Sequence, residues 1–315
     1  MPGIGIVTNP NSRRNRRNPE QLRRLGYILG QEADRHEMTQ QPEDIRRVAE
    51  HFRSKGVEVL ALNGGDGTNH VTLTTFIDVY GDEPLPLIAF LRGGTMNTIS
   101  NAVGIKGTPG RILLEVSEKY HTGQAFEVTE RDILRVDYDG HHHYGFIFGN
   151  GLIANYLDAY YDTPSRGGPV AAFSVLMQGI GSALVGGPFA KRLFQPFRAL
   201  VTVDGEPWTD GESCAVVAAT IEQIGLGFRP FIRCREKPGA FHLLAVKTSA
   251  LGFGLQLPRI RLGMPVDPAL VPSIVAHEAV FTADTPISFT IDGDMHRAVG
   301  PLRLSAGPRL RIIVR

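Results

Sequence analysis

The sequence predicts two domains, an α/β domain with a parallel sheet followed by an antiparallel β-rich domain. Before residue 105, apolar strand-like runs, polar loops and helical patterns alternate at least three times. After about residue 126 the pattern changes to short alternating runs separated by Asp-Gly and Gly-Asn-Gly turns. A chain of 315 residues is ample for two domains. We therefore expect an α/β domain over 1–126 and a β-sandwich domain over 127–300.

Composition and charge narrow the functional class. The formal net charge is +1, which argues against a strongly basic nucleic-acid-binding protein. The two cysteines, Cys214 and Cys234, are far apart and lack metal-type spacing, as expected in a reducing compartment. The strand-like start Gly3–Val7 lacks the regions of a signal peptide. These features together predict a cytoplasmic protein.

One stretch combines a buried strand with a glycine-rich loop. The apolar run Val57–Leu62 ends at Gly64-Gly65-Asp66-Gly67-Thr68, and a helical pattern then runs from Thr68 to Tyr80. Backbone N–H groups at such a helix start point towards anions, and glycine lets a ligand approach closely. Asp66 is a candidate ligand for Mg²⁺ beside a phosphate. The loop is not a Walker A loop, because no Gly-Lys-Ser/Thr follows. The alternative is an ordinary strand-to-helix turn, which any α/β protein contains.

Two other strands end in small polar loops. The first strand runs into Asn9-Pro10-Asn11-Ser12 and a basic run at positions 13–17, and helices are expected over 19–29 and 42–55. The basic run fits a solvated turn better than a phosphate or membrane contact. The strand Pro86–Leu91 ends at Gly93-Gly94-Thr95-Met96-Asn97, before a helix over 98–103. Because parallel strands share one carboxyl edge, the three loops should converge on a nucleotide.

The second half of the chain predicts an antiparallel sandwich. Its strands should be Ile133–Tyr138, Tyr144–Phe148, Ala199–Val203, Ala215–Ile221, Phe241–Val246, Ile287–Ile291 and Leu310–Val314. Within it, Pro169–Ala190 carries no charged residue. Its glycines, serines and terminal prolines lower the apolarity of the stretch, so a membrane span is the least favoured alternative. We expect a buried helix in preference to a helix that faces a membrane.

Four motifs in order give the chain a resemblance to a known family. They are Asn9-Pro10-x-Ser12, Gly64-Gly65-Asp66-Gly67-Thr68, Gly94-Thr95-x-Asn97 and Asp292-Gly293-Asp294. Together they resemble the diacylglycerol kinase catalytic family, particularly its soluble bacterial branch, which is related to sphingosine kinases. The resemblance implies an NAD kinase/phosphofructokinase-like Rossmann domain, a β-sandwich domain, an active site between the two, and a last segment, 301–315, that returns to the first domain.

The resemblance also implies an activity and its residues. The reaction would be phosphoryl transfer from ATP, with Mg²⁺, to diacylglycerol or a similar lipid alcohol. The protein would be cytoplasmic and could bind peripherally to the membrane surface at its inner face. Asp294 would be the catalytic base, Asp292 would support it, and Asp66 would hold the metal. The predicted nucleotide-binding residues are Asn9, Pro10, Asn11, Ser12, Arg13, Thr39, Gly64, Gly65, Asp66, Gly67, Thr68, His70, Thr95 and Asn97.

Several positions depart from the family pattern. Arg13 replaces a glycine, Asn69-His70-Val71 follows Thr68 where the family has an apolar residue and then Asn-Glu, and Asp294 replaces a glutamate. His70 could take over the contact that the family makes through asparagine. At 236–239, Pro238 stands where the bacterial branch has an aspartate, so a second, structural metal site is not expected.

Alternatives remain open. Asp292-Gly293 could be an ordinary hairpin turn, and a second carboxylate motif, Asp204-Gly205-Glu206, is assigned to structure. The protein could be a soluble-substrate kinase of the NAD kinase type, because those enzymes share the Gly-Gly-Asp-Gly loop. It could also be a catalytically weakened regulatory protein that binds nucleotide or lipid. The sequence leaves both a monomer and a homodimer open.

Overall fold

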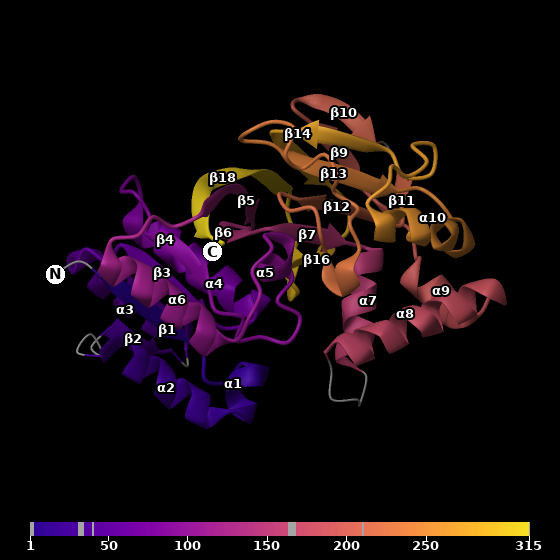
Figure 1. The fold of residues 1–315 in the computed structure, drawn as a ribbon. Helices are drawn as coiled ribbons and strands as arrows, with labels where there is room; N and C mark the ends of the chain where they lie inside the picture. Colours follow the sequence, from indigo (N-terminus) through magenta and orange to yellow (C-terminus); the bar gives the residue numbers. More distant parts are fainter. Residues whose placement is uncertain (1–2, 31–34, 40, 163–167, 210, 315) are drawn as a thin grey trace. The chain divides into compact units, whose positions relative to one another are not determined.

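A computed structural model describes residues 3–30, 35–39, 41–162, 168–209 and 211–314. These residues form two compact units (Figure 1): unit 1 comprises 1–131 and 308–315, and unit 2 comprises 132–307. Unit 1 contains a parallel sheet and unit 2 antiparallel sheets, so the predicted fold class is confirmed.

Unit 1 alternates strands and helices along the chain. Its elements are β1 (Ile4–Thr8), α1 (Arg13–Arg17), α2 (Pro19–Leu29), β2 (His36–Met38), α3 (Pro42–Ser54), β3 (Val59–Asn63), α4 (Asp66–Tyr80), β4 (Leu87–Phe90), α5 (Thr98–Ala102) and α6 (Pro109–Thr122). The strands pair in parallel in the order β2-β1-β3-β4, and Ile312 of β18 (Leu302–Ile313) continues the sheet by pairing in parallel with Ile88. Every residue of β1 and β3 is buried, as expected for strands covered on both faces.

The structure changes three local expectations in unit 1. Arg13–Arg17 form a short helix rather than a basic turn, because Arg16 N–H donates to Ser12 O and Asn15 is buried. Helix α4 begins at Asp66, two residues earlier than predicted, so the last part of the glycine motif is its first turn. Helix α6, which the sequence analysis did not assign, follows a Thr108 cap whose hydroxyl accepts Arg111 N–H.

Unit 2 is built mainly from antiparallel strands. They are β5 (Val128–Tyr138), β6 (His141–Gly145), β7 (Ile147–Asn150), β8 (Phe197–Arg198), β9 (Leu200–Val203), β10 (Glu206–Thr209), β11 (Glu212–Ser213), β12 (Ala215–Ala219), β13 (Phe241–Val246), β14 (Ser273–Ala276), β15 (Glu278–Thr282), β16 (Ile287–Ile291), β17 (Asp294–Ala298) and the first part of β18. The helices are α7 (Leu152–Tyr161), α8 (Pro169–Leu184), α9 (Pro188–Leu193), η2 (Gly225–Gly227) and α10 (Ala250–Leu262).

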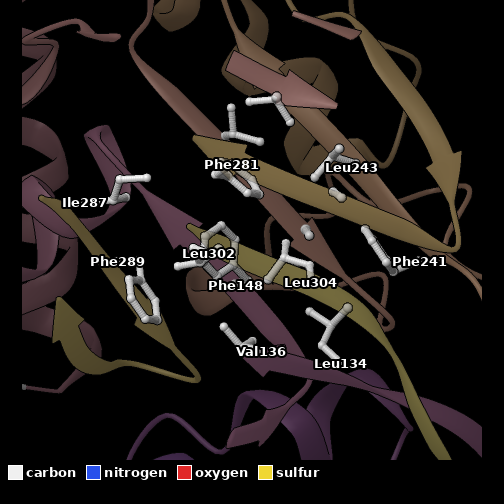
Figure 2. Close-up of a cluster of buried hydrophobic side chains, with 14 of the residues drawn as sticks. Leu134, Val136, Phe148, Phe241, Leu243, Phe281, Ile287, Phe289, Leu302 and Leu304 are labelled. Atoms are coloured by element: carbon white, nitrogen blue, oxygen red, sulfur yellow. The ribbon is translucent and has the colours of Figure 1, made fainter. Parts of the chain in front are cut away.

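Two antiparallel layers enclose the core of unit 2. One is the six-stranded sheet β14-β13-β12-β7-β16-β17, and the other contains β10-β9-β15-β18 with β5 and β6. Inward side chains from both layers meet in one buried cluster (Figure 2), with Phe148 and Phe289 opposite Phe281, Leu302 and neighbouring residues. Phe148 and Phe281 have ring centroids 5.5 Å apart. This alternation of inward apolar residues makes the sandwich.

Three Asp-Gly pairs form the tight hairpins of unit 2. Asp139-Gly140, Asp204-Gly205 and Asp292-Gly293 have positive φ at both residues, as a two-residue I′ turn requires. In each, the aspartate carboxylate accepts two neighbouring backbone N–H groups: Val299 and Gly300 for the first, His277 and Glu278 for the second, and Phe146 and Ile147 for the third. The aspartates therefore join each turn to another segment.

One of these contacts corrects a predicted strand. The sequence predicts a single strand over Tyr144–Phe148, whereas the structure ends β6 at Gly145 and begins β7 at Ile147. The N–H groups of Phe146 and Ile147 donate to Asp292 at 2.9–3.0 Å instead of to a neighbouring strand. The expected helix Pro169–Ala190 is likewise two helices, α8 and α9, separated by Val185-Gly186-Gly187.

His242 should make the stability of the protein depend on pH. This β13 residue is 1% exposed, and burial, with a smaller effect of Arg233, lowers its pKa to about 4. In the unfolded chain the histidine pKa is near 6.5, so as the pH falls the unfolded state binds the proton before the folded state does. The free energy of unfolding should therefore fall between pH 6.5 and pH 4, by about 3 kcal/mol if His242 acts alone. Urea titrations across this range would measure it, and a His242→Gln variant with an unchanged slope would contradict it.

Candidate phosphate-binding site

The candidate site is built on two glycine loops of unit 1 that touch through their backbones. A Cβ atom placed on Gly94 would lie 2.4 Å from Gly65 Cα, and one on Gly93 would lie 2.9 Å from Gly64 N. No side chain fits between backbones at this separation. The loop after β3 and the loop after β4 therefore form one continuous backbone surface.

Asp66 joins the same two loops through hydrogen bonds. It is the first residue of α4, and its carboxylate accepts the N–H groups of Thr98 (2.9 Å) and Ile99 (3.4 Å) at the start of α5. Burial raises the pKa of Asp66, while these N–H groups and the charge of Arg92 lower it in part. A cation beside the carboxylate would favour its ionised form.

The third loop is connected to the other two by side chains. Asn9 Nδ2 donates to Thr68 Oγ1 at 2.9 Å, and Ser12 Oγ donates to Gly93 O at 3.0 Å. Thr39 is buried, and its N–H donates to Thr8 O at 2.9 Å at the end of β1. The three strand ends predicted to converge are thus connected in the structure.

Asn97 holds the shape of the loop after β4. It has a left-handed backbone (φ 49°), its Oδ1 accepts Gly94 N–H, and its Nδ2 donates to Gly94 O, both at 3.1 Å. The side chain is 6% exposed, so its amide serves the loop itself. Thr95 in the same loop is exposed and available to a ligand.

The start of α4 offers donors for an anion. Within the described residues, no side chain caps this helix at Gly65, and Asp66, the acidic residue of its first turn, is engaged with α5. The amides of the first helical turn have no intrahelical acceptors, and the helix dipole adds positive potential there. Gly65, Gly67 and Thr68 are partly exposed, so an anion can reach this turn.

Other predicted residues lie beside this surface or away from it. Asn11 is exposed, Pro10 and Arg13 are partly exposed, and Arg13 is the first residue of α1. His70 is 1% exposed within α4, so its ring is buried and does not lie on the accessible surface of the loops. Asp292 and Asp294 belong to unit 2.

Asp292 and Asp294 lie at one hairpin. Asp292 forms its turn, and Asp294 is the first residue of β17, paired with Ile291. Tyr161 of α7 donates its hydroxyl hydrogen to Gly293 O at 2.9 Å, and burial together with the charge of Asp294 raises the pKa of Tyr161. The hairpin interpretation of Asp292 and a role for Asp294 are therefore compatible.

The sequence analysis missed two residues that shape the loops. Asn15, inside the basic run, donates through Nδ2 to Asn9 O at 2.8 Å and Asn63 O at 3.0 Å. Arg92 has φ 61°, and its Nη1 donates to Asn101 Oδ1 (2.7 Å) and Ile105 O (2.6 Å). For Asn15 the available signal was a single amide side chain at the centre of Arg-Arg-Asn-Arg-Arg.

The residues fit a metal that arrives with a nucleotide. Mg²⁺ is commonly held by one or two carboxylates together with substrate phosphates and water. Asp66 supplies one carboxylate beside the α4 amides, and after bonding to α5 its oxygens keep lone pairs. In the described parts of the chain, no group of three or more His, Cys, Asp or Glu residues could hold a metal by itself.

The N-terminal part of the chain matches a known family model. Residues 4–127 match the family model of the diacylglycerol kinase catalytic domain. This match confirms, for the N-terminal part of the chain, the resemblance drawn from the motifs. A comparison with curated proteins gave no match.

The fold is shared with solved bacterial structures. The crystal structure of a diacylglycerol kinase from Bacillus anthracis matches this chain with 16% sequence identity and a TM-score of 0.65. The match covers 100% of this chain and 97% of the Bacillus chain. A second protein from that organism, described provisionally as the same kind of kinase, matches over the same shares with 18% identity and a TM-score of 0.70. At these identities the likeness establishes the fold.

The loop contact can be tested with a matched pair of substitutions. Gly94→Ala should lower the free energy of unfolding by about 1–3 kcal/mol, because its Cβ would overlap Gly65 Cα. Gly65→Ala is the control, since its Cβ would lie 3.5 Å from Gly94 Cα, an ordinary contact. Urea unfolding followed by circular dichroism measures both. Equal stability of the two variants would mean that the loops are not in contact.

Proposed function

We propose that this protein is an ATP-dependent lipid kinase that transfers the γ-phosphate to the hydroxyl of diacylglycerol or a similar lipid alcohol. The observation that carries the proposal is the backbone contact of the two glycine loops in front of the uncapped start of α4, with Asp66 between α4 and α5. The family match supports the kinase class, and the lipid alcohol is the finer part of the proposal.

The proposed roles follow from the site. The α4 amides and the exposed loop residues, including Asn11 and Thr95, bind the nucleotide phosphates. Asn9, Ser12, Thr68 and Asn97 keep the loops in register through the hydrogen bonds described above. Asp66 fixes the start of α5 and holds Mg²⁺, which would neutralise phosphate charge when bound.

The acceptor side of the reaction is assigned to unit 2. Asp294 takes the proton from the lipid hydroxyl while the hydroxyl oxygen forms a bond to the γ-phosphorus of ATP. At the same time the bond between that phosphorus and the bridging oxygen breaks, and ADP leaves with that oxygen. Asp292 positions Asp294 indirectly, because it anchors their shared turn to Phe146 and Ile147. The proposal requires Asp294 and the phosphate loops to act on the same substrate pair.

The reaction class is tested with labelled ATP. Incubation with [γ-³²P]ATP, Mg²⁺ and diacylglycerol in mixed micelles should yield a chloroform-extractable labelled product. A water-soluble labelled product would instead support a soluble-substrate kinase. Nucleotide binding without any transfer would identify a regulatory protein and overturn the proposal.

Asp66→Asn should abolish Mg²⁺-dependent transfer while the fold is retained. The amide keeps an oxygen for Thr98 N–H but removes the charge that attracts the metal. The labelled-lipid assay measures the loss, and the melting temperature checks the fold. Asp82→Asn, an exposed change in the turn after α4, is the control. Near-normal kcat in Asp66→Asn would remove Asp66 from the mechanism.

Asp294→Asn should lower kcat by about 10²–10⁴-fold, the usual contribution of a general base. Binding of ATP, measured by calorimetry, should change little, because the proposed role of Asp294 is to take the proton of the lipid hydroxyl and not to bind phosphate. Glu206→Gln, on an exposed position of β10, is the matched control. If Glu206→Gln reduced kcat more than Asp294→Asn, the wrong carboxylate would have been assigned.

A further inference from the structure

Two helices of unit 2, α8 and α10, expose apolar side chains. α8 packs against both α9 and α10 (Figure 1). Their exposed apolar side chains include Phe173 at 55%, Leu184 at 70%, Leu255 at 70% and Leu262 at 72% exposure. We call the exposed apolar residues of these helices the apolar helical face: Val170, Phe173, Met177 and Leu184 on α8, and Leu251, Leu255 and Leu262 on α10.

The spacing of these residues gives each helix one exposed apolar stripe. On α8 they recur at intervals of three, four and seven residues, and on α10 at four and seven, which places them along one side of each helix. The buried residues of α8 are Ala171, Ala172 and Val175, and those of α10 are Gln256 and Ile260. The stripes therefore point away from the core of unit 2, which is uncommon for a surface in contact with water alone.

The charges on these helices all have one sign. α8, α9 and α10 contain no aspartate or glutamate, whereas Lys191, Arg192, Arg259 and Arg261 lie in the last turns of α9 and α10. All four are exposed. Arg192 lies 3.8 Å from Asp162, and Arg261 Nη1 donates to Gly227 O, so Lys191 and Arg259 are the more available cations. Apolar stripes on a group of helices whose charged residues are all basic have the composition of helices at a membrane surface.

We propose that the apolar helical face docks on an anionic lipid bilayer, with α8 and α10 lying in the plane of the interface. The apolar stripes would enter the boundary between headgroups and acyl chains, and Lys191 and Arg259 would contact lipid phosphates. The proposal rests on the proposed function for its purpose, which is access to a lipid substrate.

A membrane span and a second protein copy are less consistent with this face. α8 has 16 residues, and no helix in the described part of the chain is long and apolar enough to cross a membrane. Pairing the face with itself across a twofold axis would bring two sets of basic residues together without an acidic partner on these helices. Anionic headgroups supply the missing opposite charge.

The proposal is tested by binding to vesicles without ATP. The full chain should sediment with vesicles of phosphatidylglycerol and phosphatidylcholine in equal parts. Phe173→Glu/Leu255→Glu should weaken this partitioning by about tenfold or more, because charged groups replace apolar side chains that would enter the bilayer. Arg259→Gln should weaken it by about fivefold, the effect of one basic residue near an anionic surface. On phosphatidylcholine alone, Arg259→Gln should change nothing.

Matched controls separate docking from general apolar exposure. Tyr27→Glu/Leu114→Glu changes two exposed apolar residues of α2 and α6 and should leave partitioning unchanged. Circular dichroism checks that each variant is folded. Unchanged partitioning of the Phe173→Glu/Leu255→Glu variant would overturn the proposal. So would a dimer, seen by light scattering, that this variant dissociates while vesicle binding persists. Partitioning without lipid phosphorylation would overturn the proposed function and leave the docking surface standing.

Discussion

The contact between two backbone segments, at Gly65 and Gly94, is the constraint on which the rest of unit 1 depends. It brings the loops after β3 and β4 so close that any side chain at Gly94 would overlap the opposite backbone. Asp66 then spans the same two loops by holding the start of α5. Backbone N–H groups can serve as hydrogen-bond donors to an anion only where the loops hold them in fixed positions, because backbone amides cannot adjust as side chains do.

In unit 2 the equivalent constraint is an aspartate that bonds outside its own hairpin. Asp139, Asp204 and Asp292 all do so, although only Asp292 is followed two residues later by another aspartate. The turn at Asp292 thus has the same structural role as the other two, because each aspartate binds backbone N–H groups of another segment. What distinguishes it chemically is Asp294 and the neighbouring Tyr161. An Asp-Gly motif can therefore form an ordinary turn and also place a carboxylate directly after it.

The sequence predicted what depends on local residue type. Glycine loops after apolar runs and Asp-Gly pairs between alternating strands indicate their turns directly, so the two-part fold was confirmed. What depends on tertiary contacts could not be predicted from the pattern. Asn15 is buried inside a run of arginines, and the break at Phe146 exists because a residue 146 positions away accepts its N–H group. Helix α10 was missed because Pro258 and two glycines lie within it.

The strand β18 has a consequence for the order in which the molecule can form. Its residues Leu302–Ser305 pair with β15 in unit 2, and its later residue Ile312 pairs with β4 in unit 1. During synthesis on the ribosome, β4 is made more than 200 residues before this partner and has one unpaired edge until then. The sheet of unit 1 is therefore completed only after the whole of unit 2 has been synthesised.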